Sequence, residues 1–273
     1  MLVFKNYPKI GLLDSGSGGL SILEEIIKKI PQASYQYLCD NFYFPYGELS
    51  QAVLKERVLK ICERFVSEQR IDLLVLPCNT ASATTLDLLR ERLSIPIIGV
   101  VPAIKTAAEF SKTKHIGIIA TKATIGSSYL EGLIKQFAFS CKVTKKHSNK
   151  LVQLSEQKLL GQSISSVFLE EELGPFFLDE TIDSVVLGCT HYSFLLEDIK
   201  KFQPRKIQWI DTKIAIAKRV EFILKQKSSE KKVPSLLQKR IRLFYTKENS
   251  FSEEQKFHWK RQYSIDSFHF FQI

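Results

Sequence analysis

The sequence contains no uninterrupted apolar run of about 18 residues, so no membrane-spanning helix is expected. Its five cysteines form an odd set without a C-x-x-C pair, which argues against a disulfide framework and a zinc knuckle. The chain does not open with a cationic segment followed by a long apolar stretch, so no signal peptide is expected. These absences favour a cytoplasmic protein with reduced thiols, in which any special cysteine acts as a nucleophile or a base.

The composition is ordinary for a globular protein, with 44% hydrophobic and 25% charged residues among 273, and it excludes disordered and collagen-like chains. This length corresponds to about two domains. The net charge is +10, and residues 226–273, which include Lys231-Lys232, hold 10 basic and 5 acidic residues. Nucleic-acid binding is one interpretation of such a region, and we favour a solvated basic face instead. Six aromatic residues of this region are expected to pack onto the body: Phe251, Phe257, Trp259, Phe268, Phe270 and Phe271.

Short apolar segments alternate with segments of helical spacing. Strands are expected over residues 10–13, 35–38, 73–76 and 96–101, and helices over residues 20–30, 50–69, 82–93 and 193–202. Because the expected strands are apolar on both faces, they predict a parallel sheet in an α/β fold.

An internal repeat suggests that the chain has two related halves. Residues 10–15 resemble residues 116–121, and residues 71–78 resemble residues 182–189, so the offsets are 106 and 111 residues. Each half would then supply one cysteine, Cys78 or Cys189, from the end of one strand. Chance similarity between apolar strands is the alternative.

The ends of the expected strands carry the polar motifs, and ligands of open α/β sheets bind beyond the carboxyl ends of strands. Residues 14–19, D-S-G-S-G-G, follow the first strand, and their glycines would let the backbone approach a ligand. A tight turn is the alternative, and the absence of a following Gly-Lys-Ser/Thr excludes a Walker loop.

Cys78 and Cys189 each follow a buried strand and precede an expected helix. A helix N-terminus favours the thiolate and lowers the pKa of a thiol from about 8.5. One such cysteine alone would more often be a small buried hydrophobe, but two at equivalent positions favour a shared role. His191 is a candidate proton partner for Cys189. Nearby polar residues could cap the helices or bind a ligand: Asn79, Thr80 and Thr190.

Two facing thiols suit a reaction that inverts a stereocentre. One group removes a proton from one face of Cα while another delivers a proton to the opposite face, and the roles exchange in the reverse reaction. Nucleophilic catalysis by a single cysteine leaves the second thiol without a task. The pattern therefore indicates a racemase or an epimerase.

Five motifs, in order and spacing, resemble the cofactor-independent glutamate racemases over about residues 8–225. They are D-S-G at 14–16 with G-G-L at 18–20, P-Y-G at 45–47, C-N-T-A at 78–81, G-V-V-P-A at 99–103 and G-C-T-H-Y at 188–192. Residues 241–246 also resemble a strand near the C-terminus of the family.

The resemblance implies two pseudo-symmetric α/β domains with mostly parallel central sheets and an active site in the cleft between them. Residues 1–98 plus 207–273 would form the domain of Asp14 and Cys78, and residues 99–206 the domain of Cys189 and His191. The family uses no cofactor or metal, acts on L- and D-glutamate, supplies D-glutamate for peptidoglycan and forms homodimers. The resemblance also implies that the chain lacks the longer N-terminal extension that links some members to activation by a cell-wall nucleotide precursor.

The resemblance further assigns roles to residues. Cys78 would exchange the α-proton with D-glutamate and Cys189 with L-glutamate, assisted by Asp14 and His191 respectively. Glu156 aligns with a family carboxylate near the second thiol. The substrate would be held by Asp14, Ser15, Pro45, Tyr46, Gly47, Asn79, Thr80, Thr121, Thr124, Thr190 and His191.

The chain departs from the family pattern near Glu156. The family often has Cys-Pro where this chain has Ser148-Asn149, and Pro-Leu-Val-Glu where it has residues 153–156, Q-L-S-E, which leaves the placement of Glu156 open. A racemase for aspartate or another small acid, and a nucleic-acid-binding protein with a decayed site, are the alternatives. Cys39, Cys62 and Cys141 are interpreted as packing residues.

Overall fold

The computed structural model describes residues 8–227 and 240–273, so Lys231-Lys232 lie outside the described residues. Contacts divide the chain into two compact units, Met1–Val100 with Lys213–Ile273, and Val101–Thr212. Both boundaries differ slightly from those expected from the sequence. Gly99 ends a strand of the first unit, and residues 208–210 pair with a strand of the second. Among the described residues, no helix is long and apolar enough to cross a membrane.

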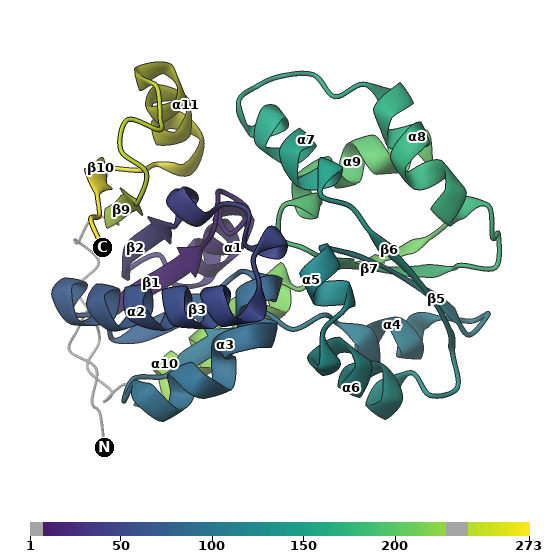
Figure 1. Ribbon diagram of the computed structural model, residues 1–273, viewed down its shortest axis with the longest axis horizontal. Helices are drawn as coiled ribbons and strands as arrows, with labels where there is room; N and C mark the ends of the chain where they lie inside the picture. Colours follow the sequence, from purple (N-terminus) through teal and green to yellow (C-terminus); the bar gives the residue numbers. More distant parts are fainter. Residues whose placement is uncertain (1–7, 228–239) are drawn as a thin grey trace. The chain divides into compact units, whose positions relative to one another are not determined.

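The first unit contains a six-stranded sheet in the order β10-β9-β2-β1-β3-β4 (Figure 1). Its strands are β1 (Lys9–Asp14), β2 (Ser34–Cys39), β3 (Leu73–Leu76), β4 (Ile97–Gly99), β9 (Arg240–Tyr245) and β10 (Ser267–Phe270). Every strand pairing in the described part of this sheet is parallel. Asp14 is opposite Cys39, and Cys39 is opposite Tyr245, so these strands end at one edge.

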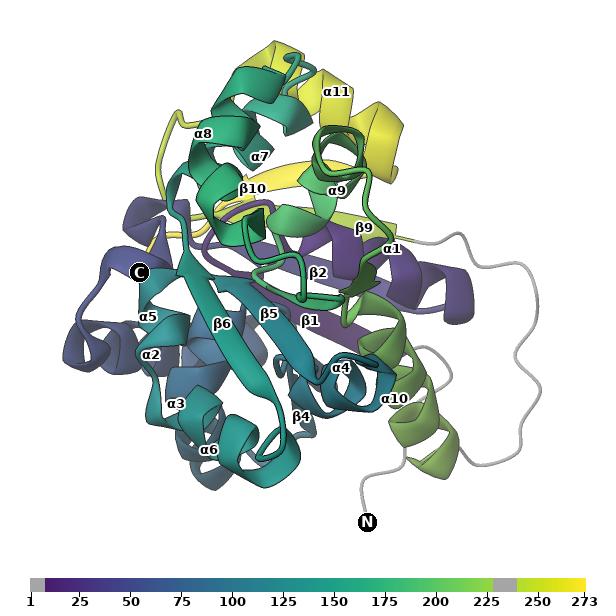
Figure 2. The ribbon, with the colours of Figure 1, turned by 90° about the vertical axis from the view of Figure 1, so that its right-hand side faces the viewer.

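Helices cover both faces of this sheet. Figure 2 shows α2 (Gln51–Gln69) and α3 (Asn79–Arg92) on one side, and α1 (Leu20–Lys29) and α10 (Lys213–Lys227) on the other. The apolar face of α2, with Leu54, Val58 and Phe65, is buried against Leu13 and Leu74 of the sheet. The helix begins where the Ser50 side chain accepts a hydrogen bond from the Val53 N–H, and it ends at Arg70 in the left-handed conformation. The helix expected over residues 50–69 is therefore confirmed.

The second unit contains a four-stranded, all-parallel sheet in the order β6-β5-β7-β8. Its strands are β5 (His115–Ala120), β6 (Lys142–His147), β7 (Ser184–Gly188) and β8 (Gln208–Ile210). On one face, α4 (Ile104–Phe110) and α6 (Ser128–Phe137) bury Ile116, Ile118 and Val186. The other face is covered by α7 (Lys150–Leu159), α8 (Ser166–Phe177) and α9 (Tyr192–Phe202) (Figures 1 and 2). A short helix, α5 (Lys122–Ile125), follows β5.

The strand order is the same in the two halves. Counted along the chain, the first four strands run in the order second, first, third, fourth, and so do the next four. In this correspondence β1 matches β5 and β3 matches β7, which are the segments that repeat in the sequence. The α/β class with parallel sheets is therefore confirmed, and Cys78 and Cys189 stand at equivalent places after equivalent strands.

The aromatic residues near the C-terminus pack less completely than the sequence suggested. Trp259 and Phe271 are buried, whereas Phe257 is 60% exposed and Phe270 is 43% exposed. The expectation is wrong for Phe257 because α11 (Glu253–Tyr263) buries only Trp259 and Tyr263, leaving its other side to solvent. Phe270 lies on β10, the edge strand of the sheet formed by the described residues, where one side of the strand has no neighbour among them.

Asp183, at the amino ends of the strands, binds the loop that connects α4 to β5. Its carboxylate accepts hydrogen bonds from the Ser111 hydroxyl (2.6 Å) and from the backbone N–H groups of Lys112 (2.7 Å) and Thr113 (2.9 Å). Burial alone would raise the pKa of Asp183, but these hydrogen bonds lower it below the usual value.

We expect Asp183→Asn to lower the free energy of unfolding by about 1–2 kcal/mol at pH 7, because an amide cannot accept all three hydrogen bonds. A carboxyl with a lowered pKa stabilises the fold above its unfolded pKa of about 3.9 and loses that effect as the pH falls through its folded pKa. The difference from wild type in urea denaturation should therefore narrow below about pH 4. The control Asp87→Asn, at an 89% exposed side chain, should change stability by less than about 0.5 kcal/mol. A constant difference down to pH 2 would contradict this account.

Candidate active site

Cys78 lies between the carboxyl end of β3 and the first residue of α3, and its side chain is buried. The Ser82 hydroxyl donates to the Leu76 carbonyl and accepts from the Val100 N–H, both at 3.0 Å, which fixes the start of α3 against β3 and β4. The thiol thus sits at a helix N-terminus, where the dipole favours a thiolate. Asn79 is also buried, and its Oδ1 has no hydrogen-bond partner in the described part of the chain.

Asp14 ends β1 and is completely buried, and the Ser15 hydroxyl donates to its Oδ1 at 3.4 Å. The neighbouring Gly19 has no room for a side chain. A Cβ there would lie 2.5 Å from Pro77 Cγ and 3.0 Å from Asp14 Oδ2. Glycine is therefore required where the start of α1 meets the ends of β1 and β3, and the same contact shows that Asp14 lies next to the segment that carries Cys78.

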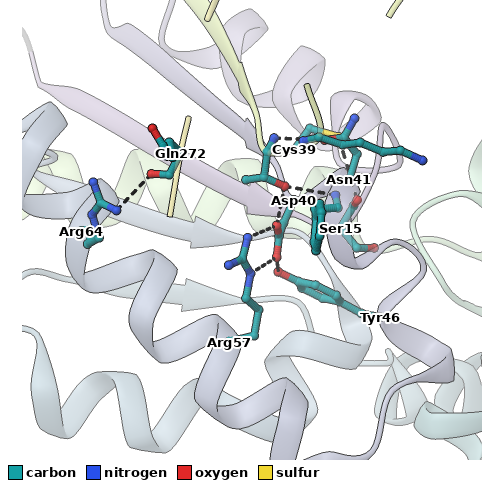
Figure 3. A network of polar contacts seen from close by, with 11 residues as sticks. Ser15, Cys39, Asp40, Asn41, Tyr46, Arg57, Arg64 and Gln272 are labelled. Atoms are coloured by element: carbon teal, nitrogen blue, oxygen red, sulfur yellow. Dashed lines mark hydrogen bonds and ion pairs between the residues drawn. The ribbon is translucent and has the colours of Figure 1, made fainter. Parts of the chain in front are cut away.

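Asp40, which follows β2, is at the centre of a cluster of polar contacts at this edge (Figure 3). Its Oδ2 accepts from the Tyr46 hydroxyl (2.7 Å) and from Arg57 Nε (2.8 Å). Its Oδ1 accepts from a terminal nitrogen of Arg57 and from the Thr246 hydroxyl, both at 2.6 Å. The Asp40 N–H donates to the Asp14 carbonyl at 2.8 Å. We call Asp40, Arg57 and Thr246 the Asp40 cluster.

The P-Y-G motif is held by this cluster. Tyr46 is buried and begins the short 3-10 turn Tyr46–Glu48, directly after Pro45. Burial and the Asp40 carboxylate raise the pKa of Tyr46 well above its ordinary value, so the phenol stays protonated and its proton is directed at Asp40. Tyr46 and Cys78 belong to the same apolar cluster as Leu76, so the structure places the P-Y-G turn near the first thiol.

In the second unit, Thr121 and Thr124 follow β5, at the position that corresponds to Ser15 and the start of α1. Thr121 caps α5, with its Oγ1 accepting the Thr124 N–H at 3.3 Å and donating to Thr124 Oγ1 at 3.0 Å. Both side chains are buried. The two residues thus form a hydroxyl pair at the carboxyl end of β5.

Cys189, Thr190 and His191 are all buried after β7, at the start of α9. Cys189 Sγ lies 3.9 Å from His191 Nδ1, and His191 Nε2 lies 2.8 Å from Glu156 Oε1. Because a carboxylate only accepts hydrogen bonds, it holds the proton on Nε2 and leaves Nδ1 to exchange a proton with the thiol. Burial would lower the pKa of His191, but Cys189 and Glu156 raise it well above the ordinary value.

The residues that depart from the family pattern lie close to Cys189, His191 and Glu156 and form hydrogen bonds there. The Ser155 hydroxyl on α7 lies 2.8 Å from the His191 carbonyl and 2.7 Å from the Leu151 carbonyl. Ser148 accepts the Leu151 N–H at the start of α7, and its carbonyl accepts the Tyr192 hydroxyl at 2.6 Å. These contacts place α7, and with it Glu156, against His191 in this chain.

The structure therefore brings the sequence-predicted residues into two groups. One is Asp14, Ser15, Pro45, Tyr46, Gly47, Cys78, Asn79 and Thr80 in the first unit, and the other is Thr121, Thr124, Glu156, Cys189, Thr190 and His191 in the second. The sequence analysis missed Asp40, Arg57, Thr246 and Ser155. Of these four residues, only Asp40 has a local sequence feature that could have identified it, because it follows an expected strand as Asp14 does.

The remaining cysteines pack within the two units, and the Cys39 thiol lies 3.9 Å from the Ser15 carbonyl oxygen. Cys62 is completely buried on α2, and burial raises the pKa of its thiol, which makes it unreactive. Cys39 is buried, and Cys141 packs partly buried against the core of the second unit. Among the described residues, no set of three or more His, Cys, Asp or Glu side chains is arranged to hold a metal ion.

The Asp/Glu/Hydantoin racemase family model matches residues 13–220. The chain is 45% identical over 244 residues to the glutamate racemase of Histophilus somni (strain 2336), covering 89% of this chain and 90% of that protein. Its fold is similar to the crystal structure of Escherichia coli glutamate racemase in complex with L-glutamate and the activator UDP-MurNAc-Ala, with a TM-score of 0.89, 34% identity and coverage of 97% and 98%. It is also similar to glutamate racemase isoform RacE1 from Bacillus anthracis, with a TM-score of 0.81, 30% identity and 98% coverage of both chains.

These matches span most of the chain, and the range of the family model, residues 13–220, contains the positions of both cysteine motifs. The chain belongs to the Asp/Glu/hydantoin racemases, a family of isomerases, and within it to the glutamate racemases.

Proposed function

We propose that this chain interconverts L- and D-glutamate without a cofactor, using Cys78 and Cys189 as two acid/base groups, and so supplies D-glutamate for peptidoglycan. The observation that carries the proposal is the equivalence of the two thiols. Each is buried after the third strand of a half with the same strand order, and each has a titratable neighbour. The relatives named glutamate racemase support the substrate.

In this mechanism the two thiols act on opposite faces of the α-carbon. With L-glutamate, the Cys189 thiolate removes the α-proton, and the Cys78 thiol delivers a proton to the other face of the resulting carbanion. The reverse reaction exchanges the roles. The proposal therefore requires one thiol and one thiolate at the start of each turnover, with both strand ends reaching the same substrate molecule.

The surroundings of the two thiols differ in a way that suits this requirement. His191, held by Glu156 and with a raised pKa, supplies a cation beside Cys189 and stabilises its thiolate. Asp14, on the strand next to β3, lies beside the segment that carries Cys78, where its carboxyl group can exchange a proton with the thiol. Asp14 and His191 would accept or return the thiol protons when the roles exchange.

The substrate's charged groups have candidate partners at both strand ends. The unpaired Oδ1 of buried Asn79 can accept a hydrogen bond from the ammonium group. The hydroxyls of Ser15, Thr80, Thr121, Thr124 and Thr190, with the backbone of the Pro45-Tyr46-Gly47 turn, are proposed to bind the carboxylates. Racemisation of aspartate or another small acid is the second candidate, and assays of each amino acid separate the two. A homodimer and a cytoplasmic location are proposed from the family resemblance alone.

Replacing either thiol should abolish racemisation, because one face of the α-carbon then lacks its acid or base. We expect Cys78→Ala and Cys189→Ala to lose turnover of both enantiomers, measured by circular dichroism of glutamate solutions. Cys141→Ala, which also removes a thiol, is the control and should stay within about threefold of wild type. Near-normal turnover by a folded Cys189→Ala protein would contradict the two-thiol mechanism.

The pH dependence of kcat/KM should be bell-shaped, because one thiol and one thiolate are needed together. Glu156→Gln removes a charge that raises the pKa of His191 and so weakens the cation beside the Cys189 thiolate, and the acid limb should therefore move to higher pH. Nitrogen NMR of the His191 ring measures the same change directly. Glu171→Gln, at an exposed position on α8, should leave the profile unchanged. A flat plateau at high pH in the wild type would be incompatible with the need for a protonated thiol.

The two helpers should serve opposite faces. Asp14→Asn should mainly slow proton abstraction from the D-enantiomer by Cys78, and His191→Asn abstraction from the L-enantiomer by Cys189, by about 10²–10⁴-fold. Overall kcat/KM must fall equally in both directions because the equilibrium constant is one. The asymmetry is therefore measured in elimination from D- and L-β-chloroglutamate. Equal slowing of both eliminations by both variants would refute the assignment of one helper to each face.

A further inference from the structure

The Asp40 carboxylate is completely buried and has no free lone pair for a ligand. It accepts four hydrogen bonds, two from Arg57 and one each from Tyr46 and Thr246, at 2.6–2.8 Å. An ionised carboxylate offers about four acceptor sites, so the set is complete. Asp40 therefore acts on its neighbours, and it cannot itself bind substrate while these bonds are intact.

The neighbours of Asp40 include two residues of the proposed site. Its backbone N–H holds the Asp14 carbonyl at the end of β1, and its side chain holds the Tyr46 hydroxyl. Figure 3 shows Arg57 and Tyr46 pointing to Asp40 from separate elements, α2 and the turn after β2. A displacement of Asp40 would therefore be transmitted to Asp14 through the backbone and to Tyr46 through the side chain.

Residues 246–250, which we call the C-terminal segment, complete the cluster although they lie about 200 residues further along the chain. Thr246 directly follows β9 and donates to Asp40, and its own N–H donates to Asn41 Oδ1 at 3.0 Å. Asn41 also donates from Nδ2 to the Ser250 hydroxyl at 2.6 Å and accepts from the Lys247 N–H at 2.9 Å. Asp40 and Asn41, which follow β2, thus hold the C-terminal segment by hydrogen bonds at the carboxyl end of that strand.

We infer that Asp40, Arg57 and Thr246 form a positioning unit that sets Asp14 and Tyr46 for proton transfer on the Cys78 side, with the C-terminal segment as a required part. This inference rests on the proposed glutamate racemase function. A bidentate arginine fixes both the direction and the distance of a carboxylate, which a lysine cannot do. A buried ion pair is weak evidence for stability, so its geometry is better explained by positioning.

The chain offers matched variants to test this unit. Arg57→Lys keeps the charge and removes the bidentate contact, and the control Arg90→Lys makes the same change on α3, where exposed Arg90 contacts the exposed Asp87. Thr246→Val keeps the shape and removes the hydroxyl, and Thr246→Ser keeps the hydroxyl. These changes are milder than loss of the Asp40 carboxylate, which would leave the partly buried Arg57 without this partner.

The readout is elimination from the two enantiomers of β-chloroglutamate. A thiolate takes the α-proton, the C–H electron pair forms the Cα=Cβ bond, and chloride leaves Cβ with its bonding pair. The enamine then hydrolyses to 2-oxoglutarate and ammonia. We expect Arg57→Lys and Thr246→Val to slow elimination from the D-enantiomer about tenfold while changing the L-enantiomer less than about threefold. Thr246→Ser should keep most of the wild-type rate with the D-enantiomer, and Arg90→Lys should match wild type.

The outcomes separate this inference from the function on which it rests. A wild-type protein that fails to racemise glutamate would overturn the proposed function. An active wild type whose Arg57→Lys and Thr246→Val variants either match it or slow both enantiomers equally would overturn the positioning unit. Urea denaturation of each variant measures the folded fraction, so a loss of rate is corrected for unfolding before the enantiomers are compared.

Discussion

In a parallel sheet every strand ends at the same edge, and the residues that follow the strands are brought together there. Both sheets of this protein are parallel throughout the described residues, and both use the order second, first, third, fourth. Asp14, Asp40 and Cys78 follow successive strands of one sheet, and Thr121 and Cys189 follow strands of the other. The site residues are therefore consequences of strand direction, because an antiparallel neighbour would carry its own carboxyl end to the opposite edge.

The two halves share a topology but differ in their electrostatics. Cys189 lies beside an imidazole whose far nitrogen is held by Glu156, and this arrangement favours a cation next to the thiol. On the other side, the strand next to β3 ends in the buried carboxyl group of Asp14. The two halves thus place two thiols at equivalent positions, while the titratable residues beside them differ.

Much of the fold follows from local patterns in the sequence. The strand over residues 73–76 is apolar at every position and is buried on both faces, and the helix over residues 50–69 has a single apolar face and a serine cap. The two thiols could be predicted because each directly follows such a strand. The Asp40 cluster could not, since its partners lie 17 and 206 residues away and nothing local marks them. Phe257 was predicted to pack onto the body and is exposed, because an apolar residue type does not show which side of a helix is covered.

The most direct test of the two-thiol account is incubation of the protein with L-glutamate in deuterated water, with NMR of the α-proton and optical rotation followed together. A monoprotic thiol that removes the α-proton can only return the same proton to the same face, whereas the opposite thiol delivers deuterium from solvent. The account predicts that early D-glutamate carries α-deuterium while the remaining L-glutamate keeps its proton. Equal deuterium in both enantiomers from the first turnover, or loss of optical rotation without incorporation of α-deuterium, would contradict it.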